Sequence, residues 1–551
     1  MLQGETVNRS IASGVFSVVS AKVVVLVVTA LSTPLLYRLL GASAFGEYAF
    51  LLSIFAIYMI FVSSGITDGV RKFLAEDRAA ANWSEHVVGF YFRLAIVLSV
   101  LGALLLVLAT RFGIVGRAFG SDLTGYFYVL AALVVTAQFR DYARKTLMGF
   151  GLERYSEPLK ILDKIGFVVV AVPLVYLGAG VIGALAGHLV ASTLVAVIGL
   201  ALVHRHVSLS CLFSRPTKRF PRKQMLTFNS MSIALVFLLM SLYHIDIVML
   251  QHFRESAAVG NYKAALTLAE FLWFIPMALQ TVFVHSTSEL WSQNRFREIS
   301  ELASRTTRYT FLLTGVMAVG LAALADVAVP IYFGADAMPA ITPLLLLLPG
   351  SLGFALARPV LAISQGKGML RYPVAATGGA AMINLVLNVA LIPRFGMHGA
   401  AIATSTGYGS MFVFHCWSAR VIGFDPLSDA RLGRSILTIV LAAGPIVALS
   451  TAITNSWLAL AVVPPAGFVI FVTFALLVGA LDPAEPFAVL STFPDPLGAK
   501  ADAIHSRLAT SATKNGERSW LHSLLFVAGL SLLVSGLTLG ILGSGIQSLA
   551  P

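Results

Sequence analysis

The pentapeptide GVIGA at residues 180–184 is followed 216 residues later by GMHGA at residues 396–400. Two further pairs of segments recur at nearly the same offset. They are FGEY at 45–48 with VGNY at 259–262, and GLERY at 151–155 with GMLRY at 368–372. One such match is weak, because glycine and alanine are common in membrane helices. Three matches in the same order predict an internal duplication.

The composition indicates a membrane protein. Of the 551 residues, 58% are hydrophobic and 12% are charged, and the mean hydropathy is +0.86. A soluble domain carries about 25% charged residues, so a water-soluble enzyme of this length is excluded. The two cysteines, Cys211 and Cys416, exclude a disulfide framework and a cysteine-rich metal site.

Long apolar runs predict about 14–15 transmembrane helices, because a bilayer core about 30 Å thick takes roughly 20 apolar residues per helix. The runs lie at 11–36, 44–67, 87–110, 122–139, 159–178, 180–203, 225–250, 258–284, 307–331, 340–364, 374–393, 395–419, 434–454, 456–480 and 520–545. The segment 481–519, rich in proline, aspartate and alanine, is expected to be a cytoplasmic linker.

The duplicated unit contains six predicted helices, and an even number gives both copies the same orientation in the membrane. The predicted fold is therefore an all-α polytopic membrane protein with two six-helix lobes, related by a pseudo-twofold axis along the membrane normal, plus extra C-terminal helices. The expected domains are an N-terminal lobe (1–215), a C-terminal lobe (216–425), a helix pair (426–480), the linker (481–519) and a final helix (520–551).

The basic charges lie mainly on one side of the predicted helices. The chain has 38 Lys and Arg against 26 Asp and Glu, a net charge of +12. Segments on the side of the N-terminus hold 28 of these cations and segments on the other side hold 6. This asymmetry places the N-terminus in the cytoplasm. It also explains the basic balance without a nucleic-acid partner.

Several stretches resemble one family. LLGASAFGEY (39–48) and DGVRKFLAE (68–76) are similar to the start of polysaccharide-export flippases. Four further stretches are similar to the second lobe of the same family: DIVML (246–250), VGNY (259–262) with Pro276, NLVLN (384–388) and IPRFGMHGAA (392–401). The chain thus resembles the oligosaccharide-lipid (polysaccharide biosynthesis/export) flippases of the multidrug/oligosaccharidyl-lipid/polysaccharide (MOP) exporter superfamily. The likeness covers about residues 5–480, and 384–401 is its most specific part.

The resemblance implies a flippase, not an enzyme, without a cofactor. It would move a polyprenyl- or dolichyl-phosphate-linked oligosaccharide from the inner to the outer leaflet by alternating access, for cell-surface polysaccharide or glycoprotein glycan assembly. The expected location is the plasma membrane, and the expected partners are this substrate, membrane lipids and other glycan-assembly membrane proteins around a monomeric transporter. The family usually has twelve to fourteen helices, and the run at 520–545 departs from that number.

Cations inside the predicted helices are candidates for a phosphate site, because a charge at mid-bilayer normally faces protein or water. Lys22 lies about 16 Å into the first helix at 1.5 Å per residue. It would line the cavity or form an ion pair, with Glu270 as one partner. Lipid II flippases of the same superfamily also carry cavity cations on the first helix, which implies a similar role here.

Five other cations lie nearer the cytoplasmic ends of helices. Arg93, Lys164 and Arg358 would either contact substrate or extend to lipid headgroups, and Asp163 is expected to neutralise Lys164. Arg71 and Lys72 lie at the inner mouth, where they would recruit anionic headgroups or anchor a helix. The working hypothesis is that Lys22 forms the phosphate site with Arg71, Arg93 or Arg358.

Uncharged and acidic residues inside the helices give further candidates. Glu270 is a candidate proton or Na⁺ coupling site, although a structural hydrogen bond fits equally. Asn384 and Asn388 share one helix face, where they bind sugar hydroxyls or, as we favour, join helices. His188 is expected to be a packing residue. Asp246 and Asp326 are expected near the outer surface without a functional role.

Two other function classes were weighed. A cation-coupled multidrug exporter of the same superfamily (MATE-like) should have an acidic cavity, whereas Lys22 makes this one mixed. A membrane enzyme of glycan assembly needs a sizeable catalytic loop, and the longest predicted loop, about 39 residues, has no carboxylate cluster. The sequence contains no GxxxxGK[ST], HExxH or paired CxxC motif, which argues against ATP hydrolysis and metal catalysis.

Overall fold

The computed structural model describes residues 2–63, 65–76, 82–208 and 220–485, together with 491, 502–503 and 506. The described chain is almost entirely helical, and no β-strand occurs in these ranges. This confirms the predicted all-α class. Most of the predicted linker (481–519) and the predicted last helix (520–545) lie outside the described residues.

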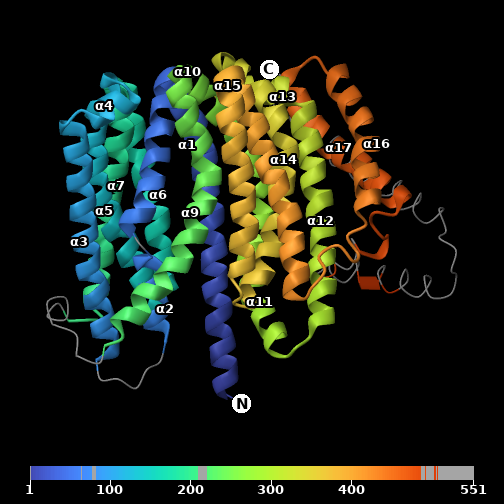
Figure 1. Cartoon of the computed structure of the whole chain (residues 1–551). Helices are drawn as coiled ribbons and strands as arrows, with labels where there is room; N and C mark the ends of the chain where they lie inside the picture. The colour runs from blue at the N-terminus through green and yellow to red at the C-terminus, as the bar shows by residue number, and fades with distance from the viewer. Residues whose placement is uncertain are drawn as a thin grey trace, which may run out of the picture. The chain divides into compact units, whose positions relative to one another are not determined.

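The helices follow one another along the chain (Figure 1). They are α1 (Leu2–Ser63), α2 (Ile66–Ala75), α3 (Trp83–Arg111), α4 (Ile114–Phe119), α5 (Thr124–Gly149), α6 (Glu153–Leu174), α7 (Gly180–His204), α9 (Arg222–Phe253), α10 (Ser256–Glu270), α11 (Phe274–Ser292), α12 (Phe296–Ala323), α13 (Ala325–Phe333), α14 (Ile341–Gly366), α15 (Arg371–Ile422), α16 (Leu432–Ala452) and α17 (Ser456–Val478). Short irregular helical turns are η1 (Ser121–Leu123), η2 (Val175–Ala179), η3 (Phe271–Trp273) and η4 (Ala335–Ala340).

Ten of the described helical segments are long and apolar enough to cross a membrane, and a bent pair at 296–333 would make eleven. Three of the ten contain 44, 52 and 52 residues, which is long enough for two crossings each at about 20 residues per crossing. All three are interrupted by glycine with positive φ, at Gly41, at Gly178 and Gly180, and at Gly396. The predicted helices therefore meet at tight glycine turns rather than at loops.

The glycine turns explain one of the duplicated motifs. Gly180 and Gly396 occupy matching positions, and their backbone angles are nearly the same: φ 53 and ψ −139 against φ 57 and ψ −130. A side chain cannot take these angles without a steric clash, so only glycine serves here. The GxxGA motif recurs because the same helix-to-helix turn recurs.

A second duplicated pair of glycines brings two helices into close contact. A Cβ on Gly46 of α1 would lie 1.8 Å from the carbonyl oxygen of Ser256, and one on Gly260 of α10 would lie 1.9 Å from that of Ala42. Residues 42 and 46 correspond to 256 and 260 at the offset of 214, so the contact is reciprocal. Reciprocal contacts between equivalent residues are the signature of a twofold axis. The predicted pseudo-twofold relation is therefore confirmed at this crossing.

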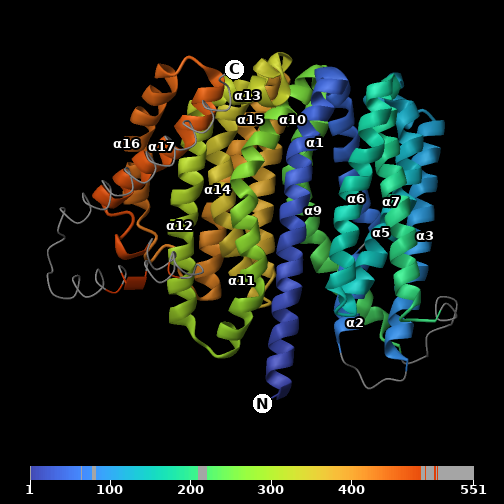
Figure 2. The ribbon, with the colours of Figure 1, turned by 180° about the vertical axis from the view of Figure 1, so that it is seen from behind.

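The described chain forms two compact units, neither of them continuous in sequence. The first comprises residues up to 269 with 332–350 and 369–414, and the second comprises 270–331, 351–368 and the residues from 415 onward. In the first unit α5 packs against α3 and α7, and α6 packs against α7 (Figures 1 and 2). In the second unit α16 and α17 pack on α12 through Leu312, Ile446 and Phe471. The lobe boundaries given above stay predictions.

Candidate functional site

A buried carboxylate lies at the centre of the second repeat. Asp246 of α9 is fully buried and accepts three hydrogen bonds. Its donors are the Tyr262 hydroxyl of α10, the Thr404 hydroxyl of α15 at 2.9 Å and the Ile247 backbone N–H at 2.8 Å. A carboxylate removed from water is costly unless it is hydrogen-bonded and then neutralised by a proton or a cation. The sequence places Asp246 near the outer surface and assigns it no role; its full burial among three hydrogen-bond donors was not predicted.

Two asparagines extend this cluster along α15. The Asn384 side chain donates to the Thr404 hydroxyl at 3.3 Å, and the Asn388 side chain donates to the Asn384 amide oxygen at 3.1 Å. Both asparagines are fully buried. The amide oxygen of Asn388 has no hydrogen-bond partner in the described part of the chain. The asparagines thus join α15 to α9 and α10 through a polar network, and one acceptor in it remains open.

The cluster of Asp246, Thr404, Asn384 and Asn388 provides carboxylate, hydroxyl and amide oxygens on two helices, α9 and α15. This is the oxygen-rich donor set that hard cations prefer. A buried carboxyl can instead hold a proton. Sequence reasoning found the asparagines from their spacing but missed Asp246, because it lies only seven residues before the end of α9 at Phe253. At the repeat offset of 214 the residue that corresponds to Asp246 is Ser32, which is 3% exposed.

The first repeat has the same arrangement with different chemistry. The Tyr48 hydroxyl and Nε2 of His188 are hydrogen-bonded at 2.8 Å. At the repeat offsets these residues correspond to Tyr262 and Thr404, whose hydroxyls are 3.2 Å apart. Phe167 occupies the position of Asn384, and its ring stacks on His188 with the ring centroids 4.0 Å apart. The first repeat therefore presents an imidazole and a phenyl ring where the second presents oxygen donors.

The predicted cationic candidates are spread over both units. Lys22 of α1 and Arg93 of α3 are half-buried, and Arg71 and Lys72 of α2 are exposed. Lys164 of α6 is half-buried, with its ammonium 5.1 Å from the centre of the Phe167 ring. The hypothesis that Lys22 forms the phosphate site with Arg71, Arg93 or Arg358 stays a prediction.

Asp163 is shared between Lys164 and a second cation. Asp163 lies 3.3 Å from the Arg140 guanidinium, which also pairs with Asp141 at 2.9 Å and donates to the Ser192 hydroxyl at 3.1 Å. The charge of Asp163 also acts on Lys164. Arg140 of α5 was not singled out from the sequence, because it lies on a predicted inner segment.

Two candidates lie in the second unit. Arg358 of α14 is only 6% exposed, and its guanidinium lies 5.1 Å from the centre of the Phe354 ring one turn earlier. Its Nε and Nη1 have no hydrogen-bond partner among the described residues. Glu270 is half-buried at the last position of α10, directly before the turn η3. A buried guanidinium with open donors is well suited to bind an anion.

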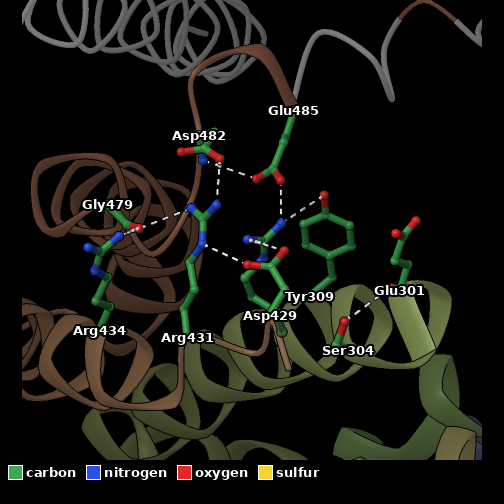
Figure 3. A network of polar contacts seen from close by, with 10 residues as sticks. Glu301, Ser304, Tyr309, Asp429, Arg431, Arg434, Gly479, Asp482 and Glu485 are labelled. Atoms are coloured by element: carbon green, nitrogen blue, oxygen red, sulfur yellow. Dashed lines mark hydrogen bonds and ion pairs between the residues drawn. The ribbon is translucent and has the colours of Figure 1, made fainter. Parts of the chain in front are cut away.

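A third polar network, also in the second unit, is balanced in charge (Figure 3). Arg308 of α12 contacts Asp429 at 3.2 Å and Glu485, while Arg431 contacts Asp482 at 2.7 Å and Asp429 at 3.2 Å. The hydrogen bond that Arg431 donates to Asp482 and the charges of both aspartates raise the pKa of Arg431 above its ordinary value. Three arginines, counting Arg434 on the Gly479 carbonyl, face three carboxylates, so this network ties α12, α16 and α17 together and leaves no net charge for a ligand.

Comparison with known proteins identifies the family. The model of the polysaccharide biosynthesis protein family matches residues 11–283, and the MatE family model matches residues 232–390. The chain is 26% identical over 175 residues to an uncharacterised membrane protein of Methanocaldococcus jannaschii, and 24% identical over 238 residues to the probable low-salt glycan biosynthesis flippase Agl15 of Haloferax volcanii. The matches cover 32% and 42% of this chain but only 34% and 49% of those relatives.

The fold is similar to that of a solved transporter. The lipid II flippase MurJ in an inward closed conformation matches with a TM-score of 0.67 at 12% identity, covering 85% of this chain and 98% of MurJ. At this identity the likeness concerns the fold alone. The two family models, the glycan flippase relative and the shared fold together show that the chain is a multi-pass membrane protein of the flippase and transporter families in the multidrug/oligosaccharidyl-lipid/polysaccharide superfamily.

Proposed function

We propose that this protein flips a lipid-linked oligosaccharide carrying an anionic phosphate from the inner to the outer leaflet, and that a proton or Na⁺ bound at Asp246 drives the transport. The observation that carries the coupling is the full burial of Asp246, in a hydrogen-bonded network that runs through Thr404 and Asn384 to the open amide oxygen of Asn388. A carboxylate in such a place changes its interactions when it gains or loses a cation, and that change can bias a conformational equilibrium.

The cations inside the helices support an anionic substrate. The predicted phosphate-site residues Lys22, Arg71, Lys72, Arg93, Lys164 and Arg358 are all basic, and Arg358 is buried with open donors. A phosphate that leaves water needs such charge-assisted hydrogen bonds to offset its desolvation. The glycan flippase relative supports the same class of cargo. We place the N-terminus in the cytoplasm and the protein, as a monomer, in the plasma membrane.

A second candidate function is a cation-coupled multidrug exporter. It is favoured by the match of the MatE model to residues 232–390, which include Asp246, Asn384 and Asn388. Both functions would use the same coupling site, so the substrate decides between them. A drug exporter would carry cationic compounds, which the basic residues listed above would repel.

The coupling is tested with Asp246→Asn and the matched control Asp326→Asn. Asp326 lies exposed on α13 and has no place in the cluster. Protein in liposomes is given a labelled polyprenyl-diphosphate oligosaccharide, and flipping is followed with and without a Na⁺ or pH gradient. We expect the gradient to accelerate wild type and Asp326→Asn at least tenfold and to leave Asp246→Asn unchanged. A gradient response retained in Asp246→Asn would contradict coupling at this site.

A further inference from the structure

We propose that the facing sides of α5 and α6 in the first unit form an anion-binding site, made by Arg144, Lys160 and Lys164, for an anionic group of the cargo. The inference deepens the proposed function and rests on it for the identity of the cargo. The ligand chemistry is a phosphate or a carboxylate, from the lipid carrier or from an acidic sugar.

The charges around these helices do not balance. The cluster contains six cations against four carboxylates, a difference of +2. They are Arg71, Arg140, Arg144, Lys145, Lys160 and Lys164 against Asp68, Asp141, Glu157 and Asp163. Like charges brought together inside a membrane protein repel one another, and an anion from outside the chain removes that repulsion.

The ion pairs assign most of the carboxylates to other partners. Arg140 takes both Asp141 and Asp163, and Lys145 lies 3.9 Å from Asp68. Within the described ranges, no carboxylate oxygen lies within 4.0 Å of Arg144, Lys160 or Lys164. Arg144 donates one hydrogen bond, from Nε to the carbonyl oxygen of Ser156 at 3.3 Å. The remaining carboxylate, Glu157, is 4% exposed and its charge acts on both Arg144 and Lys160, while Lys164 shares Asp163 with Arg140. The excess positive charge of the cluster therefore includes these three side chains.

The position of the lysines argues against simple extension to lipid headgroups. Lys160 and Lys164 are one turn apart and share a face of α6. Lys164 lies 11 residues after the start of α6 at Glu153, about 16 Å along the helix at 1.5 Å per residue. It is half-buried, as are Lys160 and Arg144. Half-buried ionisable side chains on a membrane helix normally face protein or a water-filled space, not lipid.

Aromatic side chains hold Lys164 in place. Its ammonium lies over the Phe167 ring, Phe167 stacks on His188, and His188 is hydrogen-bonded to Tyr48 of α1. Phe167 and Tyr48 are fully or nearly fully buried. A cation fixed by a packed column loses little side-chain entropy when it binds an anion, which favours affinity.

The test uses purified full-length protein in nanodiscs and isothermal titration with two probes, farnesyl diphosphate and digalacturonate. The charge-removing variant is Lys160→Gln with Lys164→Gln, and the control is Arg111→Gln, which lies exposed at the last residue of α3, outside the cluster. We expect at least a tenfold loss of affinity for one probe in the double variant and less than a twofold change in the control. Loss for farnesyl diphosphate identifies the carrier phosphate, and loss for digalacturonate identifies an acidic sugar.

Equal affinities in wild type and the double variant, or no binding of either probe to wild type, would overturn the proposal. If the double variant does not fold, Lys164→Arg and Lys164→Met replace it. We then expect the arginine to retain affinity within about threefold and the methionine to lose it, and equal affinities in these two would overturn the site. Failure of wild type to flip any lipid-linked saccharide would refute the proposed function while leaving the binding result intact.

Discussion

Replacing Arg308 by leucine should destabilise the second unit less than removing its two carboxylate partners. The Arg308 side chain is 1% exposed, whereas the side chains of Asp429 and Glu485 are 44% and 21% exposed. After Arg308→Leu the two carboxylates can recover water, and the leucine fills part of the apolar space. After Asp429→Asn with Glu485→Gln, a buried guanidinium is left without a counter-charge.

The magnitudes follow from this difference in exposure. Breaking a buried ion pair costs about 3–5 kcal/mol when the remaining charge stays buried, and we assign that range to the double carboxylate variant. When the remaining charges are partly hydrated, the cost is smaller, and we expect about 1–3 kcal/mol for Arg308→Leu. The exposed pair Arg297 and Glu301 gives the control, because Arg297→Gln should cost at most about 1 kcal/mol.

The assay is thermal unfolding of the purified protein in detergent, followed by tryptophan fluorescence and by loss of monodisperse protein. Because large membrane proteins often unfold irreversibly, the comparison is the order of the midpoints at one heating rate. We expect the midpoints to decrease in the order Arg297→Gln, Arg308→Leu, double carboxylate variant. A lower midpoint for Arg308→Leu than for the double variant would refute the reasoning from exposure.

Three further predictions concern the repeat crossing and the candidate sites. Gly46→Ala should lower expression and thermal stability strongly, since its Cβ would lie 1.8 Å from a backbone oxygen. The control Gly125→Ala, whose Cβ would have nothing within 4 Å, should be neutral or stabilising by about 0.5–1 kcal/mol. Equal thermal midpoints of the two variants would contradict the close contact at Gly46. Lys22→Ala should reduce flipping in liposomes at least tenfold and Lys22→Arg less than threefold, and unchanged flipping in both would remove Lys22 from the phosphate site. Wild type should bind one Na⁺ or one proton per chain at the Asp246 cluster, because Ser32 and His188 of the first repeat occupy the positions of Asp246 and Thr404. A measured stoichiometry of two ions per chain would show that both repeats bind the ion.

The fold was predictable because two simple signals agreed. Apolar runs of membrane-spanning length gave the helices, and the recurring GxxGA motif gave the repeat, which the matching backbone angles of Gly180 and Gly396 confirm. The reciprocal contact of Gly46 and Gly260 was not predictable, because sequence spacing does not tell which helix a glycine approaches. The charge-balanced network at Arg308 was also missed, because its partners lie 121 and 177 residues further along the chain.

The candidate site was only partly predictable. Periodicity placed Asn384 and Asn388 on one face, but it could not show that Asp246 and Tyr262 meet them, since that contact joins three helices. Asp246 was expected near the outer surface because the end of α9 is only seven residues away in the sequence. Its side chain is nevertheless completely buried, and it accepts hydrogen bonds from α10 and α15. Lys164 was identified as a cation near the cytoplasmic end of a predicted helix, but the sequence could not show that Arg140 shares its expected counter-charge, Asp163.

The central claim is that the chain carries a lipid-linked, anionic saccharide across the membrane. It is tested most directly by wild-type protein in liposomes that hold a fluorescent polyprenyl-diphosphate oligosaccharide, with a cationic dye measured in parallel. We expect the label to become accessible to an external quencher at least tenfold faster than in protein-free liposomes, while the dye does not accumulate. Accumulation of the dye without movement of the saccharide would contradict the claim and favour a drug exporter.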